Sequence, residues 1–143
     1  MESDGSGLRY RLRRALRQIG AQHRQLHELH ARLRRAVASE DRQDAGERFR
    51  RYQEAVGAHF ALEDDVFFPA LHGLHPEQGE ALERLGRDHD DLLDELVRLG
   101  SLLDRETFAV FGAGFESLRA AFASHEKREE DLVSRLTGAS LEG

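Results

Sequence analysis

Cysteine is absent from this chain of 143 residues, and proline occurs only twice. The lack of cysteine excludes thiolate metal sites, cysteine nucleophiles and disulfide bonds, and it favours a reducing compartment. No apolar run is long enough to span a bilayer, and the polar N-terminal residues resemble neither a signal peptide nor an anchor. We therefore expect a cytoplasmic protein with no membrane association.

The charge balance gives no reason to expect a nucleic-acid partner, since the formal net charge is −6. Arginine is nevertheless frequent in the first 35 residues. That run could be a polyanion-binding face, but charge runs on helices usually face solvent. We interpret it as a solvated helix face and predict no nucleic-acid binding.

The apolar residues recur at alternating steps of three and four, which is the spacing of helices that bury one face. They form four such stripes, within residues 12–37, 49–70, 82–103 and 108–136. No β-type alternation competes with them. Short connections between long helices favour antiparallel neighbours, so the sequence predicts an all-α, up-down-up-down four-helix bundle.

The length fits a single domain with one core. We place the bundle at residues 8–137, between flexible tails at 1–7 and 138–143. The segment Ser39-Glu40-Asp41 supplies residue types that cap helix N-termini and is expected to begin the second helix, and Asp104 is expected to cap the fourth.

Six polar residues interrupt the apolar stripes: His23, His59, Glu63, His89, His125 and Glu129. In a helical hairpin, residues equidistant from the turn lie at the same height. This rule places the four histidines in one layer and the two glutamates one turn away, with apolar layers on either side. The apolar layer beyond the glutamates is predicted to contain Leu16, Val66, Leu82 and Leu132.

The same pattern occurs twice in the chain. His23, His59 and Glu63 recur as His89, His125 and Glu129, at a constant offset of 66 residues. Each half is a helical hairpin that carries one histidine and, 36 residues later, a His-x-x-x-Glu segment. Two such hairpins facing each other predict a bundle with pseudo-two-fold symmetry.

The chemistry of these six residues indicates a metal site. Carboxylates in an apolar core are costly without a partner, and no lysine or arginine lies on the stripes. Nitrogen and oxygen donors suit iron, manganese or zinc, and six ligands exceed one tetrahedral site. We predict two ions, each held by two histidines, with both glutamates and an oxide or hydroxide between them. The alternative is a polar layer that fixes the register of the helices.

Four segments carry a resemblance to a known family. They are Gln22-His23-Arg24, His59-Phe60-Ala61-Leu62-Glu63-Asp64 with Phe67-Phe68-Pro69, Arg87-Asp88-His89, and His125-Glu126-Lys127-Arg128-Glu129-Glu130. Over almost its whole length the chain resembles the hemerythrin-like proteins with His-His-Glu cation-binding domains. The resemblance implies a non-haem di-iron centre that binds dioxygen, nitric oxide or peroxide, in oxygen binding or redox sensing.

One departure from that family keeps other functions open. Dioxygen-carrying hemerythrins have a further histidine one turn after the third-helix ligand, where this chain has Leu93. An unsaturated metal can activate a substrate, so an enzyme that consumes hydrogen peroxide or reduces nitric oxide is the alternative. Iron handling is a second alternative, although the Glu-x-x-His pairs of ferritin-like bundles are missing.

Several further residues have more than one interpretation. His27, one turn after His23, is either a fifth histidine ligand or a partly solvated residue beside the stripe. His30 and Tyr52 are predicted to form a buried hydrogen-bonded pair. The acids beside the ligands either accept hydrogen bonds from ligating imidazoles or lie on the solvated face. These acids are Asp64, Glu126 and Glu130.

Overall fold

The computed structural model describes residues 6–138, and helices account for nearly all of them. The α-helices are α1 (Ser6–Ala38), α2 (Arg42–Leu62), α3 (Phe68–Leu74), α4 (Gly79–Gly100) and α5 (Phe108–Thr137). A π-helical turn, Glu63–Phe67, joins α2 to α3, and a short 3₁₀ turn, Pro76–Gln78, precedes α4. No strand occurs within the described residues, which confirms the predicted all-α class.

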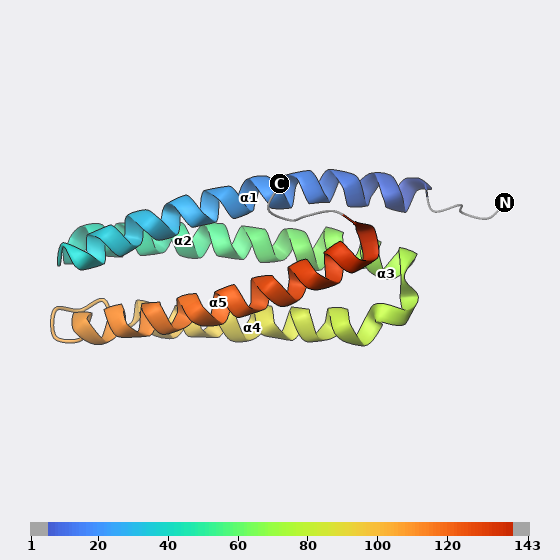
Figure 1. Ribbon diagram of the computed structural model, residues 1–143. Coiled ribbons are helices and arrows are strands. Elements are labelled where there is room, and N and C mark those ends of the chain that lie inside the picture. The colour runs from blue at the N-terminus through green and yellow to red at the C-terminus, as the bar shows by residue number, and fades with distance from the viewer. Residues whose placement is uncertain (1–5, 139–143) are drawn as a thin grey trace.

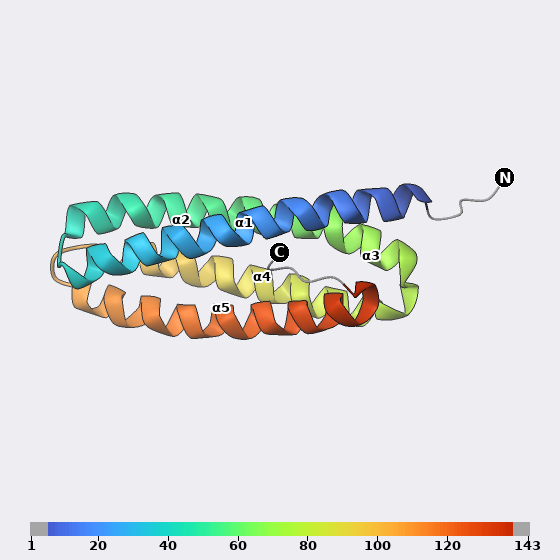
Figure 2. The same cartoon turned by 45° about the horizontal axis from the view of Figure 1, so that its top comes forward.

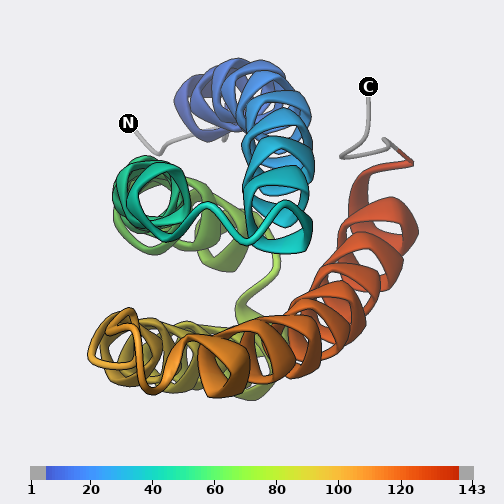
Figure 3. The ribbon, with the colours of Figure 1, turned by 90° about the vertical axis from the view of Figure 1, so that its left-hand side faces the viewer.

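The long helices form two antiparallel hairpins that lie side by side (Figures 1 and 2). One hairpin consists of α1 and of the arm made by α2, the π turn and α3, and the other consists of α4 and α5. The view along the bundle shows α2 beside α4, with α1 and α5 on the other side (Figure 3). The predicted up-down-up-down four-helix bundle is therefore confirmed.

The ends of the helices differ in part from the sequence predictions. Within the predicted segment Ser39-Glu40-Asp41, the residue that caps α2 is Asp41, whose Oδ1 accepts a hydrogen bond from the Asp44 N–H at 3.0 Å. Asp104 is not the cap of α5; that prediction is wrong, and the N-cap is Thr107. Asp104 lies instead in the turn before the helix, where its carbonyl oxygen accepts a hydrogen bond from the Thr107 N–H, and the Thr107 hydroxyl donates to the Leu102 carbonyl oxygen at 2.8 Å.

The described part of the chain begins inside a helix, because α1 starts at Ser6. At the other end, Gly138 has a positive φ of 73°, the left-handed conformation with which glycine often ends a helix. Apart from these residues, the tails predicted for 1–7 and 138–143 lie outside the described residues. None of the described helices is both long and apolar enough to cross a membrane.

The π turn changes which side of the second arm faces the core. The Phe68 N–H donates to the Glu63 carbonyl oxygen five residues earlier, so the turn holds one residue more than an α-helix would. As a result Val66 is 38% exposed, whereas Phe67 is fully buried. The prediction that Val66 belongs to the apolar layer is wrong, because the extra residue rotates the buried face by one position.

The core consists of two apolar clusters with a polar layer between them. One cluster lies toward the α1–α2 turn and is built on aromatic rings such as Phe49 and Phe111, whose centroids are 5.3 Å apart. The other lies toward α3 and contains Ile19, Phe67 and Leu71 among others. Of the remaining residues predicted for this layer, Leu82 and Leu132 are buried there and Leu16 packs against them. The polar groups are thus held in the middle of the bundle, far from its ends.

Candidate metal centre

Four imidazoles and two carboxylates meet between the two apolar clusters. They come from α1 (His23), α2 (His59), the π turn (Glu63), α4 (His89) and α5 (His125 and Glu129). Each of the six residues is at most 5% exposed. The structure therefore brings together all six site residues that the sequence singles out.

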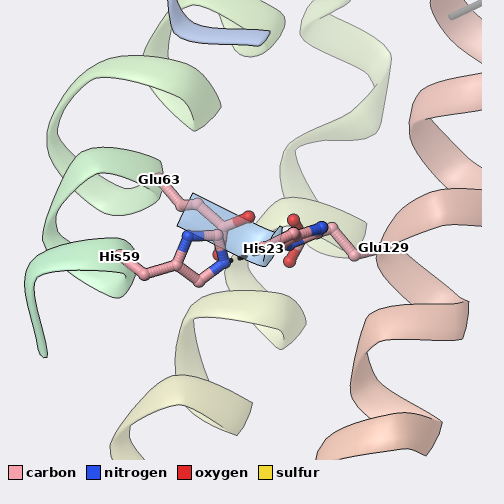
Figure 4. A group of neighbouring side chains, drawn as sticks. All are labelled: His23, His59, Glu63 and Glu129. Carbon is pink, nitrogen blue, oxygen red and sulfur yellow. Dashed lines mark hydrogen bonds and ion pairs between the residues drawn. The ribbon is translucent and has the colours of Figure 1, made fainter. Parts of the chain in front are cut away.

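The first group of donor atoms lies between α1 and α2 and reaches across to α5. The Nε2 atoms of His23 and His59 are 3.1 Å apart, and His59 Nε2 is 3.6 Å from Glu63 Oε1. With Glu129, these residues point toward one another from α1, from the arm of α2 and the π turn, and from α5 (Figure 4). One donor atom from each of the four lies within 4.8 Å of all the others. We call this set the α1/α2 position.

The second group lies between α4 and α5. His89 Nε2 is 3.1 Å from Glu63 Oε1, and His125 Nε2 is 3.2 Å from Glu129 Oε2. The donor atoms of His89, His125 and both glutamates again lie within 4.8 Å of one another. We call this set the α4/α5 position. Both carboxylates therefore belong to both positions, which adjoin each other in the core.

Three of the four imidazoles donate a hydrogen bond from Nδ1, the ring nitrogen that faces away from the centre. His59 donates to Gln22 Oε1 at 2.9 Å, His89 to Asp64 Oδ1 at 2.9 Å, and His125 to Asp88 Oδ2 at 3.1 Å. A neutral imidazole that carries its proton on Nδ1 presents the Nε2 lone pair on the opposite side of the ring. Each of these bonds therefore directs a lone pair into the centre, as an outer hydrogen bond does for a metal-ligating histidine.

These outer partners were only partly foreseen. Asp64 is one of the acids considered as acceptors, but Gln22 and Asp88 were missed by reasoning from the sequence. The sequence does contain a signal for these acceptors, because each one is the chain neighbour of a site residue: His23, Glu63 or His89. Such a neighbour lies on the flank of the buried face, where it can reach the imidazole of the adjacent helix.

Burial sets the protonation of the metal-free centre. Desolvation raises the pKa of Glu129 to about 8 and lowers the pKa of His59 and of His89 to about 3. Burial also lowers the pKa of His125, although the hydrogen bond to Asp88 opposes this effect. The three imidazoles are therefore neutral near pH 7 and available as ligands.

Several buried polar atoms at the centre have no hydrogen-bond partner among the described residues. They are both carboxylate oxygens of Glu63, Oε1 of Glu129, and Nε2 of His89 and of His125. The short His89–Glu63 contact is not a hydrogen bond, because the Nε2 lone pair faces a carboxylate oxygen. Unpartnered buried groups of this kind are costly in a folded protein. A cation between them would satisfy every one, so the donor set fits a metal ion.

Two other histidines lie outside the centre. The side chain of His27 is 61% exposed, and its Nε2 is 3.6 Å from Glu126 Oε2 on α5. This favours the interpretation of His27 as a partly solvated residue rather than a ligand. The ring of His30 meets Tyr52 edge-on at 5.8 Å, but its Nε2 has no hydrogen-bond partner among the described residues. The predicted His30–Tyr52 hydrogen bond is therefore wrong.

Aromatic rings cover the α4 side of the centre, whereas the α1–α5 side is open. Phe60 stacks on His89 with ring centroids 3.9 Å apart, and Phe122 stacks on Phe60 at 5.5 Å. On the other side, a groove of about 400 Å³ between α1 and α5 is lined in part by His23 and Ala123. Because His23 is one of the six site residues, this groove adjoins the centre.

This four-helix bundle buries two adjoining sets of imidazole and carboxylate donors that could hold metal ions. The chain belongs to a family of this kind, the hemerythrin HHE cation-binding domains, whose family model matches residues 14–136. The match includes all six site residues, and it confirms the family resemblance seen in the sequence. No curated protein and no solved structure matches the chain.

Proposed function

We propose that this protein holds two iron ions at the centre and binds a small oxidant there, in oxygen binding or redox sensing. The observation that carries the proposal is that Glu63 and Glu129 belong to both donor sets. Each position is faced by two imidazoles and shares both carboxylates with the other. Six ligands arranged in this way suit a pair of ions better than a single one.

Iron is favoured by the donor chemistry together with the resemblance to hemerythrins. Nitrogen and oxygen donors without sulfur also suit manganese and zinc, but the pair proposed here must change oxidation state. When bound, iron supplies a redox-active centre with coordination positions left for a small ligand. The protein contributes the orientation of the imidazoles through Gln22, Asp64 and Asp88, and the exclusion of water by Phe60 and Phe122.

The proposed oxidants are dioxygen, nitric oxide and peroxide, which are small enough for the groove beside His23. The experiment is metal analysis of protein from iron-supplemented cells, with the optical spectrum recorded before and after the reduced protein meets each oxidant. We expect about two irons per chain, and a ligand-to-metal charge-transfer band that reverses when dioxygen is removed.

Two variants sharpen this experiment. H89A removes a ligand from the α4/α5 position and should lower both the iron content and the absorption band. H72A changes an exposed histidine near the α3–α4 turn and should leave both unchanged. Wild-type protein that retains no iron, or whose spectrum ignores all three oxidants, would exclude the proposal.

A second candidate function is catalytic, and Leu93 is the observation that favours it. Leu93 packs against the apolar cluster at the place where dioxygen-carrying hemerythrins have a further ligand. Each position therefore has only two histidines, and an unsaturated pair of metals can activate peroxide or nitric oxide. Steady-state consumption of either oxidant, abolished in H89A and retained in H72A, would identify an enzyme.

A further inference from the structure

The internal repeat extends beyond the six site residues to the groups behind the imidazoles. Gln22 accepts the hydrogen bond from His59, and Asp88 accepts the one from His125. Each acceptor and its histidine are 37 positions apart in the chain. Gln22 and Asp88 thus occupy equivalent places in the two hairpins, but one is a neutral amide and the other a carboxylate.

A second pair of equivalent positions in the repeat, Asp64 and Glu130, carries an acid in both halves. Asp64 accepts from His89, and the corresponding position in the other half of the repeat is Glu130, also an acid. The surroundings of Asp88 differ as well, because Arg128 Nη2 donates to its Oδ2 at 2.8 Å. At the place equivalent to Arg128 the chain has Leu62, which carries no charge.

An imidazole that donates to a carboxylate is a more basic ligand than one that donates to an amide. His89 and His125 both donate to carboxylates, whereas His59 donates to Gln22. Arg128 withdraws part of the charge of Asp88, but the side chain of Arg128 is 54% exposed and that of Asp88 31%, so solvent screens part of their interaction. The stronger pair of imidazoles therefore lies at the α4/α5 position.

We propose that the two metal positions are inequivalent: the α4/α5 position binds the first ion, and the α1/α2 position binds the second more weakly and exchanges it. This inference rests on the proposed function, since it assumes a pair of ions. Gln22 and Asp88 act through His59 and His125, so they are positioning residues that set metal affinity.

The test is a titration of the metal-free protein with Zn²⁺, which is redox-inert and diamagnetic. Calorimetry should resolve two binding steps whose affinities differ by roughly tenfold or more, the effect expected of an outer hydrogen-bond partner. In histidine-selective NMR spectra, the first equivalent should shift the signals of His89 and His125. The second equivalent should shift those of His23 and His59.

Two isosteric variants assign the difference to these residues. D88N should weaken the first step by roughly 10- to 100-fold, and Q22E should tighten the second step until the two approach each other. D91N is the matched control, because it removes one exposed acid from the same helix and should change neither step. Q22E leaves the Asp88–Arg128 pair intact, so its result stands even if D88N folds poorly.

The outcomes separate this inference from the proposed function. Two Zn²⁺ ions bound with equal affinity, or steps unchanged in Q22E, would overturn the inequivalence while leaving the paired site in place. Protein that binds no Zn²⁺ would overturn both.

Discussion

Glu129 is buried among imidazoles that are themselves held neutral, so the pH affects the stability of the metal-free protein in opposite directions through these two kinds of group. Its folded-state pKa of about 8 lies above the ordinary value of 4.5. Its contribution to stability is therefore complete below pH 4.5 and is lost as the pH rises through 8. His59 and His89 behave in the opposite way, since their pKa falls from 6.5 to about 3. Their contribution is complete above pH 6.5 and is lost as the pH falls toward 3.

These opposing effects predict a pH optimum for the metal-free protein. Its free energy of unfolding should be greatest near pH 6.5, fall in acid because of the two histidines, and fall toward pH 8 because of Glu129. E129Q should abolish the alkaline decline and keep the acid one. Urea denaturation of chelator-treated protein across this range measures both, and an alkaline decline that persists in E129Q would contradict the assignment.

The position of His27 gives a second prediction for single residues. Because its side chain is largely exposed and lies near Glu126, H27A should keep the full metal content of the wild-type protein. H23A, one turn earlier on the same helix, should lose metal from the α1/α2 position. Metal analysis of the two variants side by side distinguishes them, and loss of metal in H27A would make this histidine a ligand.

Among the helices and turns, the π turn has the most specific consequence. Phe67→Ala should cost about 3–5 kcal/mol of unfolding free energy, because it opens a cavity at a fully buried ring. Val66→Lys should change stability by less than about 0.5 kcal/mol, since Val66 is partly exposed. If this segment were an uninterrupted α-helix, Val66 would be buried and Phe67 exposed, so Val66→Lys would cost more stability than Phe67→Ala. Thermal or urea unfolding of the two variants decides between the two geometries.

The groove between α1 and α5 gives a prediction about access to the centre. Ala123 lines it together with His23, and it also lines the adjoining cavity beside Tyr52. A123F should fill this space and slow the reaction of the reduced protein with dioxygen, without changing the iron content. Stopped-flow measurements against wild-type protein test this, with A113F, on the same helix and away from the groove, as the control. Equal rates in A123F and wild type would show that the oxidant enters elsewhere.

The sequence predicts the heights of the site residues in the bundle better than it predicts the π turn or the hydrogen-bond acceptors behind the imidazoles. The heights of the six site residues follow from the hairpin geometry alone, because short turns fix the register of antiparallel helices. The π turn is harder to predict, since every residue from Glu63 to Phe67 is compatible with an α-helix; the local signal lies beyond the turn, at Pro69, which has no N–H to donate to the Asp65 carbonyl oxygen. The acceptors Gln22 and Asp88 depend on the rotation of each helix about its axis. The spacing of apolar residues in the sequence shows which face of a helix is buried, but it does not fix the rotation closely enough to say which residue beside that face contacts a given imidazole.

For the whole molecule, binding of the proposed metal ions would be coupled to folding, because the candidate ligands come from both hairpins. A ligand that binds only the folded state adds about 2.7 kcal/mol of stability at a hundredfold excess over its Kd. Removing the metal with a chelator should then lower the Tm on the order of 10 °C for a chain of this size. H89A should respond much less to the chelator. Calorimetric scans of both proteins check this, and an unchanged wild-type Tm would show that the ions contribute nothing to the fold.

His23, His59 and His89 each lie near the midpoint of their helical arm, and His125 only slightly beyond it. Helices come apart from their ends inward, so thermal fraying reaches these positions last. The ions would therefore link the four helical arms at the middle of the bundle, while both ends of the bundle could still open locally. In hydrogen-exchange experiments, the slowest amides should form a belt across all four arms, and that belt should vanish when the ions are removed.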